Sequence, residues 1–281
     1  MRAVLGVSKT EFFSLLATFE QVLLEEQTAK KRKRAVGGGR IGKIKPARNK
    51  LFFILWYIKV YPTFDVAAYV FGSSKTKTHV WVHDILPVLE KTLKRKIVLP
   101  KRKIRTPEEF LAAFPEAQEV LIDGMERPTT RSKKDKIQKK HYSGKKKRHM
   151  RKNTVITDTK KQILALSPTK HGKVHDKKQL DKSTILNKIP ECITVYADTG
   201  YLGIQHQHEN TLLPHKRPPK GVLTKWWNRE VSKVRIKVEY AIGGIKRFRA
   251  VSDIFRGKNG SDDRITLVAA GLWNLHLQMS G

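Results

Sequence analysis

Five short runs of apolar and β-branched residues after Pro100 limit what this chain can fold into more than any other feature of the sequence. The runs occupy residues 119–123, 154–158, 163–167, 193–198 and 211–214. Their length and composition predict strands, and the second and third lie close enough together to form a hairpin. Residues 177–187 and 221–250 have helical patterns. Strands interspersed with helices predict an α/β fold in which helices flank a mixed sheet.

The first hundred residues favour helices instead. Ser8 and Glu11 have the spacing of a capping box, and apolar residues then recur at helical intervals to about Thr28. Residues 30–50 hold ten basic residues and no acid, a composition typical of a flexible linker. A nuclear-localisation or RNA-binding arm is the alternative for its KKRKR run, and composition does not separate the two.

Residues 51–93 have the pattern of a helix-turn-helix. Helices are predicted over 51–60, over 64–71, and from a serine cap at residue 73 or 74 through Leu89. In such a unit the second helix lies in the DNA major groove with its first residues at base edges. The candidate DNA contacts are therefore Lys75, Lys77, Thr78 and His79. A plain three-helix bundle with a solvated basic face is the alternative, and the charge of the chain favours DNA binding.

The net charge is +33, from 58 lysines and arginines against 25 acids. Such a field attracts polyanions by releasing their condensed counterions, so nucleic acid is the expected partner and a membrane is not. No apolar run reaches the roughly 20 residues needed to cross a bilayer, and no secretory signal is visible. We therefore expect the chain to stay in the cytoplasm, associated with the nucleoid. The single cysteine, Cys192, excludes an internal disulfide and a cysteine-rich zinc site.

Two of the predicted strands end on an aspartate, Asp123 in LIDG and Asp198 in YADTG. Open α/β sheets keep their ligands at the carboxyl ends of strands, and two neighbouring carboxylates repel unless a cation lies between them. Oxygen ligands without cysteine favour magnesium or manganese. The alternative is that each aspartate only caps the turn after its strand. A further pair, His175 and Asp176, could assist such a site or form a local hydrogen bond.

A third acid, Glu239, lies in the predicted helix 221–250. Helical geometry places Arg235, Glu239 and Lys246 within about 40° of one another, beside an apolar stripe that should pack against the sheet. A local ion pair between Arg235 and Glu239, worth about 0.3–0.5 kcal/mol, is the alternative and predicts no relation to the aspartates.

These residues carry a resemblance to a known family. Asp198 follows Asp123 by 75 positions, Glu239 follows Asp198 by 41, and Arg235, Glu239 and Lys246 have the spacing R-x3-E-x6-K. Together with LIDGMERP, HYSGKKKRHM, GKVHD and ADTGYLG in this order, the pattern resembles the DDE transposases of insertion sequences, in the group typified by insertion sequence five and related to Harbinger transposases. The family's tyrosine three positions before the arginine is Ser232 here.

The resemblance implies a ribonuclease-H-like catalytic domain preceded by an all-α helix-turn-helix domain. It implies that Asp123, Asp198 and Glu239 hold two Mg²⁺ ions, which Mn²⁺ can replace, and that Arg235 and Lys246 grip phosphates beside the scissile bond. The basic block 131–152 carries twelve basic residues and one acid, and we expect it to follow the DNA backbone. Its densest run is Lys145, Lys146, Lys147 and Arg148.

The implied function is a DNA transposase that binds the terminal inverted repeats of its element and performs metal-dependent cleavage and strand transfer into target DNA as a homodimer. The predicted domains are 1–50, a helix and basic linker; 51–95, the helix-turn-helix; 96–117, a connector; and 118–281, the catalytic domain. The alternatives are a transposase-derived DNA-binding protein without catalysis and, less well supported, a ribosomal or RNA-packaging protein. The presence of all three acids argues against the first alternative, and basic binding alone gives no reason for the paired aspartates in the second.

Overall fold

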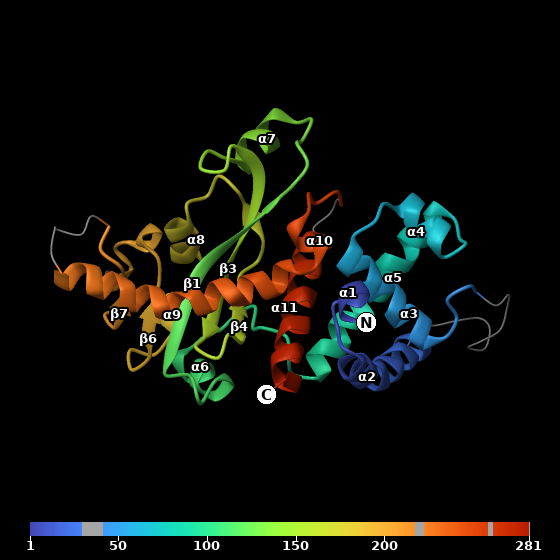
Figure 1. Ribbon diagram of the computed structural model, residues 1–281, viewed down its shortest axis with the longest axis horizontal. Coiled ribbons are helices and arrows are strands. Elements are labelled where there is room, and N and C mark those ends of the chain that lie inside the picture. The colour runs from blue at the N-terminus through green and yellow to red at the C-terminus, as the bar shows by residue number, and fades with distance from the viewer. Residues whose placement is uncertain (30–41, 217–221, 258–260, 281) are drawn as a thin grey trace. The chain divides into compact units, whose positions relative to one another are not determined.

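The computed structural model describes residues 1–29, 42–216, 222–257 and 261–280 (Figure 1). The chain divides into two compact units, the first made of residues 1–99, 245–253 and 257–281, and the second of residues 100–244 and 254–256. The predicted boundaries assigned everything after residue 118 to one domain, whereas the first unit recruits the end of the chain. The KKRKR run of the predicted linker lies outside the described residues.

The described part of the first unit is helical. The capping box is confirmed, because the Ser8 side chain accepts the backbone N–H of Glu11 and the Glu11 side chain accepts that of Ser8. The three helices predicted for the helix-turn-helix are present, although the third continues past Leu89 to Arg95. The helices are α1 (Arg2–Leu5), α2 (Lys9–Thr28), α3 (Ala47–Val60), α4 (Phe64–Val70), α5 (Lys75–Arg95), α10 (Arg249–Ser252) and α11 (Ser261–Ser280). None of the described helices is long and apolar enough to span a lipid bilayer.

The C-terminal helix α11 completes the core of the first unit. It packs on α5 and α2, and its Asn274 side chain donates to the Val98 carbonyl. Upstream of it, Phe248 is fully buried, and its ring occupies the space that a side chain at Gly6 would need. Phe248 also ends the predicted 221–250 helix early, because its extended backbone separates α9 (Val222–Lys246) from α10. The first unit is thus closed by residues from both ends of the chain.

Glu11 is a buried carboxylate in this core, with 1% of the residue exposed. His276 Nδ1 lies 2.9 Å from Glu11 Oε1, and Arg2 Nη2 lies 3.4 Å from it. Burial alone would raise the pKa of Glu11, but the hydrogen bonds from His276 and the Ser8 N–H, with the charges of His276 and Arg2, outweigh it and hold the pKa below its ordinary range. The ionised form therefore stabilises the fold.

We expect Glu11→Gln to lower the free energy of unfolding by about 1–3 kcal/mol at pH 7, because buried donors lose a charged acceptor. A depressed folded pKa contributes stability above the unfolded value of about 4.3 and loses it as the pH falls through the folded value. The difference in free energy of unfolding between wild type and the Glu11→Gln variant should therefore shrink below about pH 4. Urea unfolding at pH 7 and pH 3.5 measures it, and an equal difference at both would contradict this account.

The second unit is built on a mixed sheet. Its described strands are ordered β2-β3-β1-β6-β7, with β4 and β5 also paired to β3. β1 is antiparallel to β3 and parallel to β6, and β6 is parallel to β7. The five predicted strands and the hairpin are present, and the architecture is the predicted α/β sheet. The first strand does not end on Asp123 as predicted but continues to Pro128, and the last two strands are shorter than predicted. The strands are β1 (Glu119–Pro128), β2 (Tyr142–Ser143), β3 (Arg148–Asp158), β4 (Ile163–Leu166), β5 (Lys170–His171), β6 (Thr194–Tyr196) and β7 (Thr211–Leu212).

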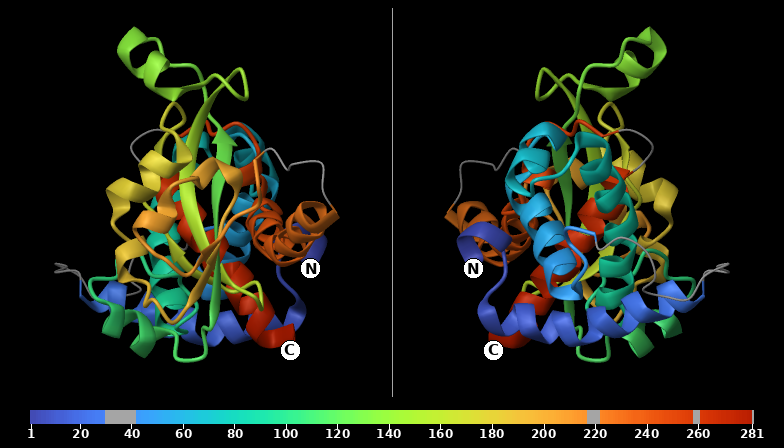
Figure 2. Two further views of the ribbon diagram at one scale, coloured as in Figure 1. Left: turned by 90° about the vertical axis from the view of Figure 1, so that its left-hand side faces the viewer. Right: turned by 90° about the vertical axis from the view of Figure 1, so that its right-hand side faces the viewer.

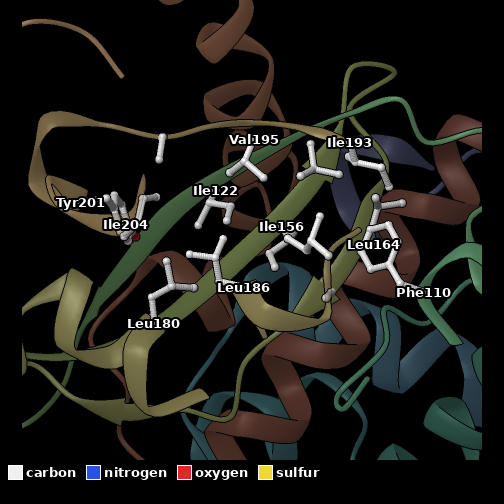
Figure 3. Close-up of a cluster of buried hydrophobic side chains, with 14 of the residues drawn as sticks. Phe110, Ile122, Ile156, Leu164, Leu180, Leu186, Ile193, Val195, Tyr201 and Ile204 are labelled. Atoms are coloured by element: carbon white, nitrogen blue, oxygen red, sulfur yellow. The ribbon is translucent and has the colours of Figure 1, made fainter. Parts of the chain in front are cut away.

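Helices cover this sheet. They are α6 (Pro107–Ala113), α8 (Asp176–Ser183) and α9, with 3-10 turns at Leu186–Lys188, Thr199–Tyr201 and Ile204–His206. Helix α7 (Asp135–His141) does not cover the sheet and buries none of its residues. One face of β1, β3 and β6 packs on α8 and these turns through a cluster that includes Ile122, Ile156, Leu180, Val195 and Ile204 (Figure 3). Burying each such side chain contributes about 1.5–3 kcal/mol. The helix predicted over 177–187 ends earlier, because Thr184 adopts a left-handed conformation.

The basic block 131–152 is largely structured. β1 continues to Pro128, α7 follows, and β3 begins at Arg148, so the block forms an arm that projects beyond the rest of the sheet (Figure 2). The arm is residues 129–149.

Candidate active site

Asp123 and Asp198 are brought together by the parallel pairing of their strands. Asp123 lies within β1 and Asp198 lies two residues after the end of β6, so both carboxylates belong to neighbouring strands of one sheet. Each also accepts the next backbone N–H, from Gly124 and Thr199 respectively, at 2.7 Å. Asp198 thus also caps the turn after its strand. Asp123 lies within β1, so turn capping does not explain both acids.

The environment of Asp123 makes its carboxyl group harder to ionise than a free aspartate. Burial is the largest cause and raises the pKa of Asp123 to about 6. The Gly124 N–H and the charge of Arg235 lower it, whereas the charges of Asp198 and Asp176 raise it. A divalent cation placed among these carboxylates would relieve both the burial cost and the repulsion.

Asp176 is a third aspartate at this point, and the sequence reasoning left its role open. It is the first residue of α8, and its Oδ1 lies 2.9 Å from the position that a Cβ on Gly124 would occupy. Tyr201 Oη lies 3.4 Å from the same position. Gly124 therefore leaves room for both groups beside Asp123. The signals in the sequence were the glycine after Asp123 and the HD pair in GKVHD.

The Tyr201 hydroxyl is buried and has no hydrogen-bond partner among the described residues, although the residue is only 1% exposed. Burial, with the nearby charges of Asp123, Asp176 and Asp198, raises its pKa well above the ordinary range. Buried hydroxyls are normally paired, so this one indicates a polar group missing from its surroundings. Carboxylate oxygens beside such a hydroxyl are donors that suit Mg²⁺ or Mn²⁺.

Glu239 is not part of this cluster. It is exposed on α9, and among the described residues no group of three or more Asp, Glu, His or Cys side chains is close enough to hold a metal ion. Its assignment as the third acid stays a prediction. Arg235, one turn earlier, places Nη1 3.4 Å from Asp198 Oδ1. Its ion pair is therefore made with the aspartate, and not with Glu239 as the local-pair alternative required. Lys246 is the last residue of α9, about two turns beyond Glu239.

The candidate DNA contacts on α5 are only partly available. Lys77 and His79 are exposed, and Lys75 is exposed in an ion pair with Asp65 at 3.0 Å. The prediction for Thr78 is wrong, because its side chain is fully buried and its hydroxyl donates to the Phe64 and Lys75 carbonyls. Thr78 joins α4 to α5 instead.

The four basic residues predicted to follow the DNA backbone are all exposed. Lys145, Lys146 and Lys147 form the turn before β3, and Arg148 is its first residue. Their side chains project from the arm, where no acid within residues 136–152 opposes them. Their contact with DNA stays a prediction.

Comparison with known proteins gives two family matches. The model described as "DDE superfamily endonuclease" matches residues 122–274, and the one described as "Helix-turn-helix of DDE superfamily endonuclease" matches residues 42–95. The chain is 29% identical over 235 residues to the probable transposase for insertion sequence element IS702 of Microchaete diplosiphon. The aligned segment covers 82% of this chain and 81% of the relative. No solved structure matches it.

Proposed function

Because this chain belongs to the DDE superfamily of endonucleases, we propose that it is a DNA transposase that binds the terminal inverted repeats of an insertion sequence and performs cleavage and strand transfer. Its substrates are double-stranded DNA ends and target DNA. Two ends are joined in one event, so it acts as a homodimer on DNA, in the cytoplasm at the nucleoid.

The convergence of Asp123 and Asp198 on neighbouring parallel strands carries this proposal. Asp123, Asp198 and Glu239 would hold two Mg²⁺ ions, with Mn²⁺ as a substitute. When bound, the ions supply Lewis acidity on both sides of a scissile phosphate. Arg235, already within 3.4 Å of Asp198, is suited to grip a phosphate oxygen, and Lys246 would act further along the same helix. Glu239 would need a change of rotamer or of helix position to join the pair.

A cleavage assay on DNA that carries the ends of the cognate element tests this function. The full chain should cut those ends with Mg²⁺ or Mn²⁺ and lose the activity in EDTA, while it still binds the DNA. Binding without cleavage under every metal condition would favour the alternative, a transposase-derived DNA-binding protein. Failure to bind the ends would contradict both.

The basic arm gives a second measurable expectation. Replacing Lys145, Lys146 and Lys147 with alanine should weaken DNA binding and reduce the slope of log affinity against log salt by about 3, because each phosphate contact contributes about 0.9 to the slope. Fluorescence anisotropy with labelled duplex DNA between 50 and 300 mM salt, roughly the range over which such slopes are resolved, measures it.

A matched control removes the same charge outside the arm, from the exposed lysines Lys101, Lys103 and Lys160. This triple variant should change the slope by less than one. Equal slopes for the two triple variants would mean that only the net charge of the chain matters, and the arm would lose its assigned role.

A further inference from the structure

A buried lysine lies beside the carboxylate cluster. Lys152 on β3 is directly opposite Glu126 on β1 in the strand register, and its side chain is 8% exposed. Its Nζ lies 2.8 Å from Glu126 Oε1 and 3.2 Å from Asp176 Oδ1. Lysines are almost never this buried unless they are paired. Here one ammonium joins two acids from different elements of the second unit.

The contact with Asp176 connects Lys152 to the proposed cleavage centre. The same oxygen, Asp176 Oδ1, packs where a side chain at Gly124 would stand, and Gly124 directly follows Asp123. The charge of Asp176 also acts on Asp123. Asp176 is therefore fixed on one side by the Lys152 ammonium and on the other by the backbone beside Asp123.

Stability alone does not account for this arrangement. A buried ion pair is often no more stabilising than apolar residues of the same volume, although removal of one partner is costly. Glu126 is 13% exposed and balances the lysine charge within the sheet, whereas the Asp176 side chain is 29% exposed. Asp176 is thus the member that faces accessible space, and Glu126 and Lys152 are its support.

We propose that Lys152 is a positioning residue of the cleavage centre, whose ammonium holds the Asp176 carboxylate beside Asp123 and so sets the geometry of the carboxylates that face a divalent cation. The inference rests on the proposed function. Groups that orient the ligands of a metal site typically change metal affinity or activity by about 10–100-fold when they are removed.

The experiment compares Lys152→Met with the double variant Glu126→Gln/Lys152→Met. The single variant leaves Glu126 buried without its cation and should unfold at a lower temperature. The double variant removes both charges and should melt near wild type. Both should bind Mn²⁺ at least about tenfold more weakly, by electron paramagnetic resonance on the DNA-free chain, and cleave at least about tenfold more slowly, because Asp176 has lost its partner in each.

Lys170→Met is the matched control, since Lys170 on β5 is the register neighbour of Lys152 but is exposed. It should bind Mn²⁺ and cleave like wild type. If the double variant regains wild-type Mn²⁺ affinity and cleavage, Lys152 only neutralises Glu126 and this inference is overturned while the proposed function stands. If wild type itself neither binds Mn²⁺ nor cleaves, the proposed function fails and the inference falls with it.

Discussion

Replacing Asp198 with alanine is expected to slow DNA strand cleavage by about 1,000-fold or more. Asp198 is proposed to hold a metal ion, and the loss of such a carboxylate would remove about 4 kcal/mol of transition-state stabilisation. DNA affinity should not fall, since the substitution removes a negative charge and frees Arg235, which pairs with Asp198 at 3.4 Å, for phosphate. The fold should survive, because the side chain is 42% exposed and makes a local bond with Thr199 and one partly exposed ion pair with Arg235 on α9. Single-turnover cleavage and anisotropy on the same DNA measure the two effects.

Asp253→Ala is the control for charge. Asp253 has a similar exposure, 38%, and belongs to a surface ion pair with Arg249. The Asp253→Ala variant should cleave DNA at the wild-type rate. Cleavage by Asp198→Ala within tenfold of wild type would show that this aspartate does not serve the reaction, and the metal site would have to be sought elsewhere.

Replacing Gly172 with alanine is expected to destabilise the second unit by about 3 kcal/mol, the upper part of the range for overpacking. A Cβ at this position would lie 2.5 Å from the Met150 carbonyl oxygen and 2.7 Å from that of His141. Both obstacles are backbone atoms, one on β3 and one at the end of α7, so no side-chain rotation relieves them. The chain must shift at the base of the arm and in the segment that leads to Asp176.

Denaturant unfolding with tryptophan fluorescence measures this loss. Gly144→Ala is the matched control, since Gly144 is in the arm but a Cβ there meets nothing within 4 Å; its effect should stay within about 0.5 kcal/mol. Equal stability of the two variants would mean that the base of the arm adapts freely. The arm would then be less firmly attached than its contacts indicate.

The elements that the sequence predicted well are those whose signal is local. The capping box at Ser8 needs only a serine and a glutamate three residues apart, and strand runs such as 119–123 need only a few apolar residues. The meeting of Asp123 with Asp198 was predicted from two strand ends at one edge of the sheet. The structure brings the two acids together by the parallel register of β1 with β6, although β1 continues past Asp123.

The features that escaped prediction depend on contacts between distant residues. β1 and β3 extend through charged segments because Glu126 and Lys152 neutralise each other across the register, and no periodicity of apolar residues reports this. Thr78 is polar but buried, because its hydroxyl has backbone acceptors on α4 and α5. Helix α11 was not predicted, since its apolar residues are explained only by their packing on α5 and α2, which are distant in sequence. The place of Glu239 relative to the aspartates remains a prediction.

The first unit is built from both ends of the chain, and this has a consequence for biosynthesis. Domains tend to fold as units in the order in which the ribosome releases them. Here Phe248, α10 and α11 complete a core begun by residues 1–99, so the core around the helix-turn-helix region is completed only after the whole sheet has been translated. A premature stop codon after residue 244 would leave the aspartate-bearing sheet intact in sequence while it deprives the DNA-binding unit of its closing helix. Truncated copies of such a gene would thus yield incompletely folded products, which we expect chaperones and proteases to remove before they bind DNA.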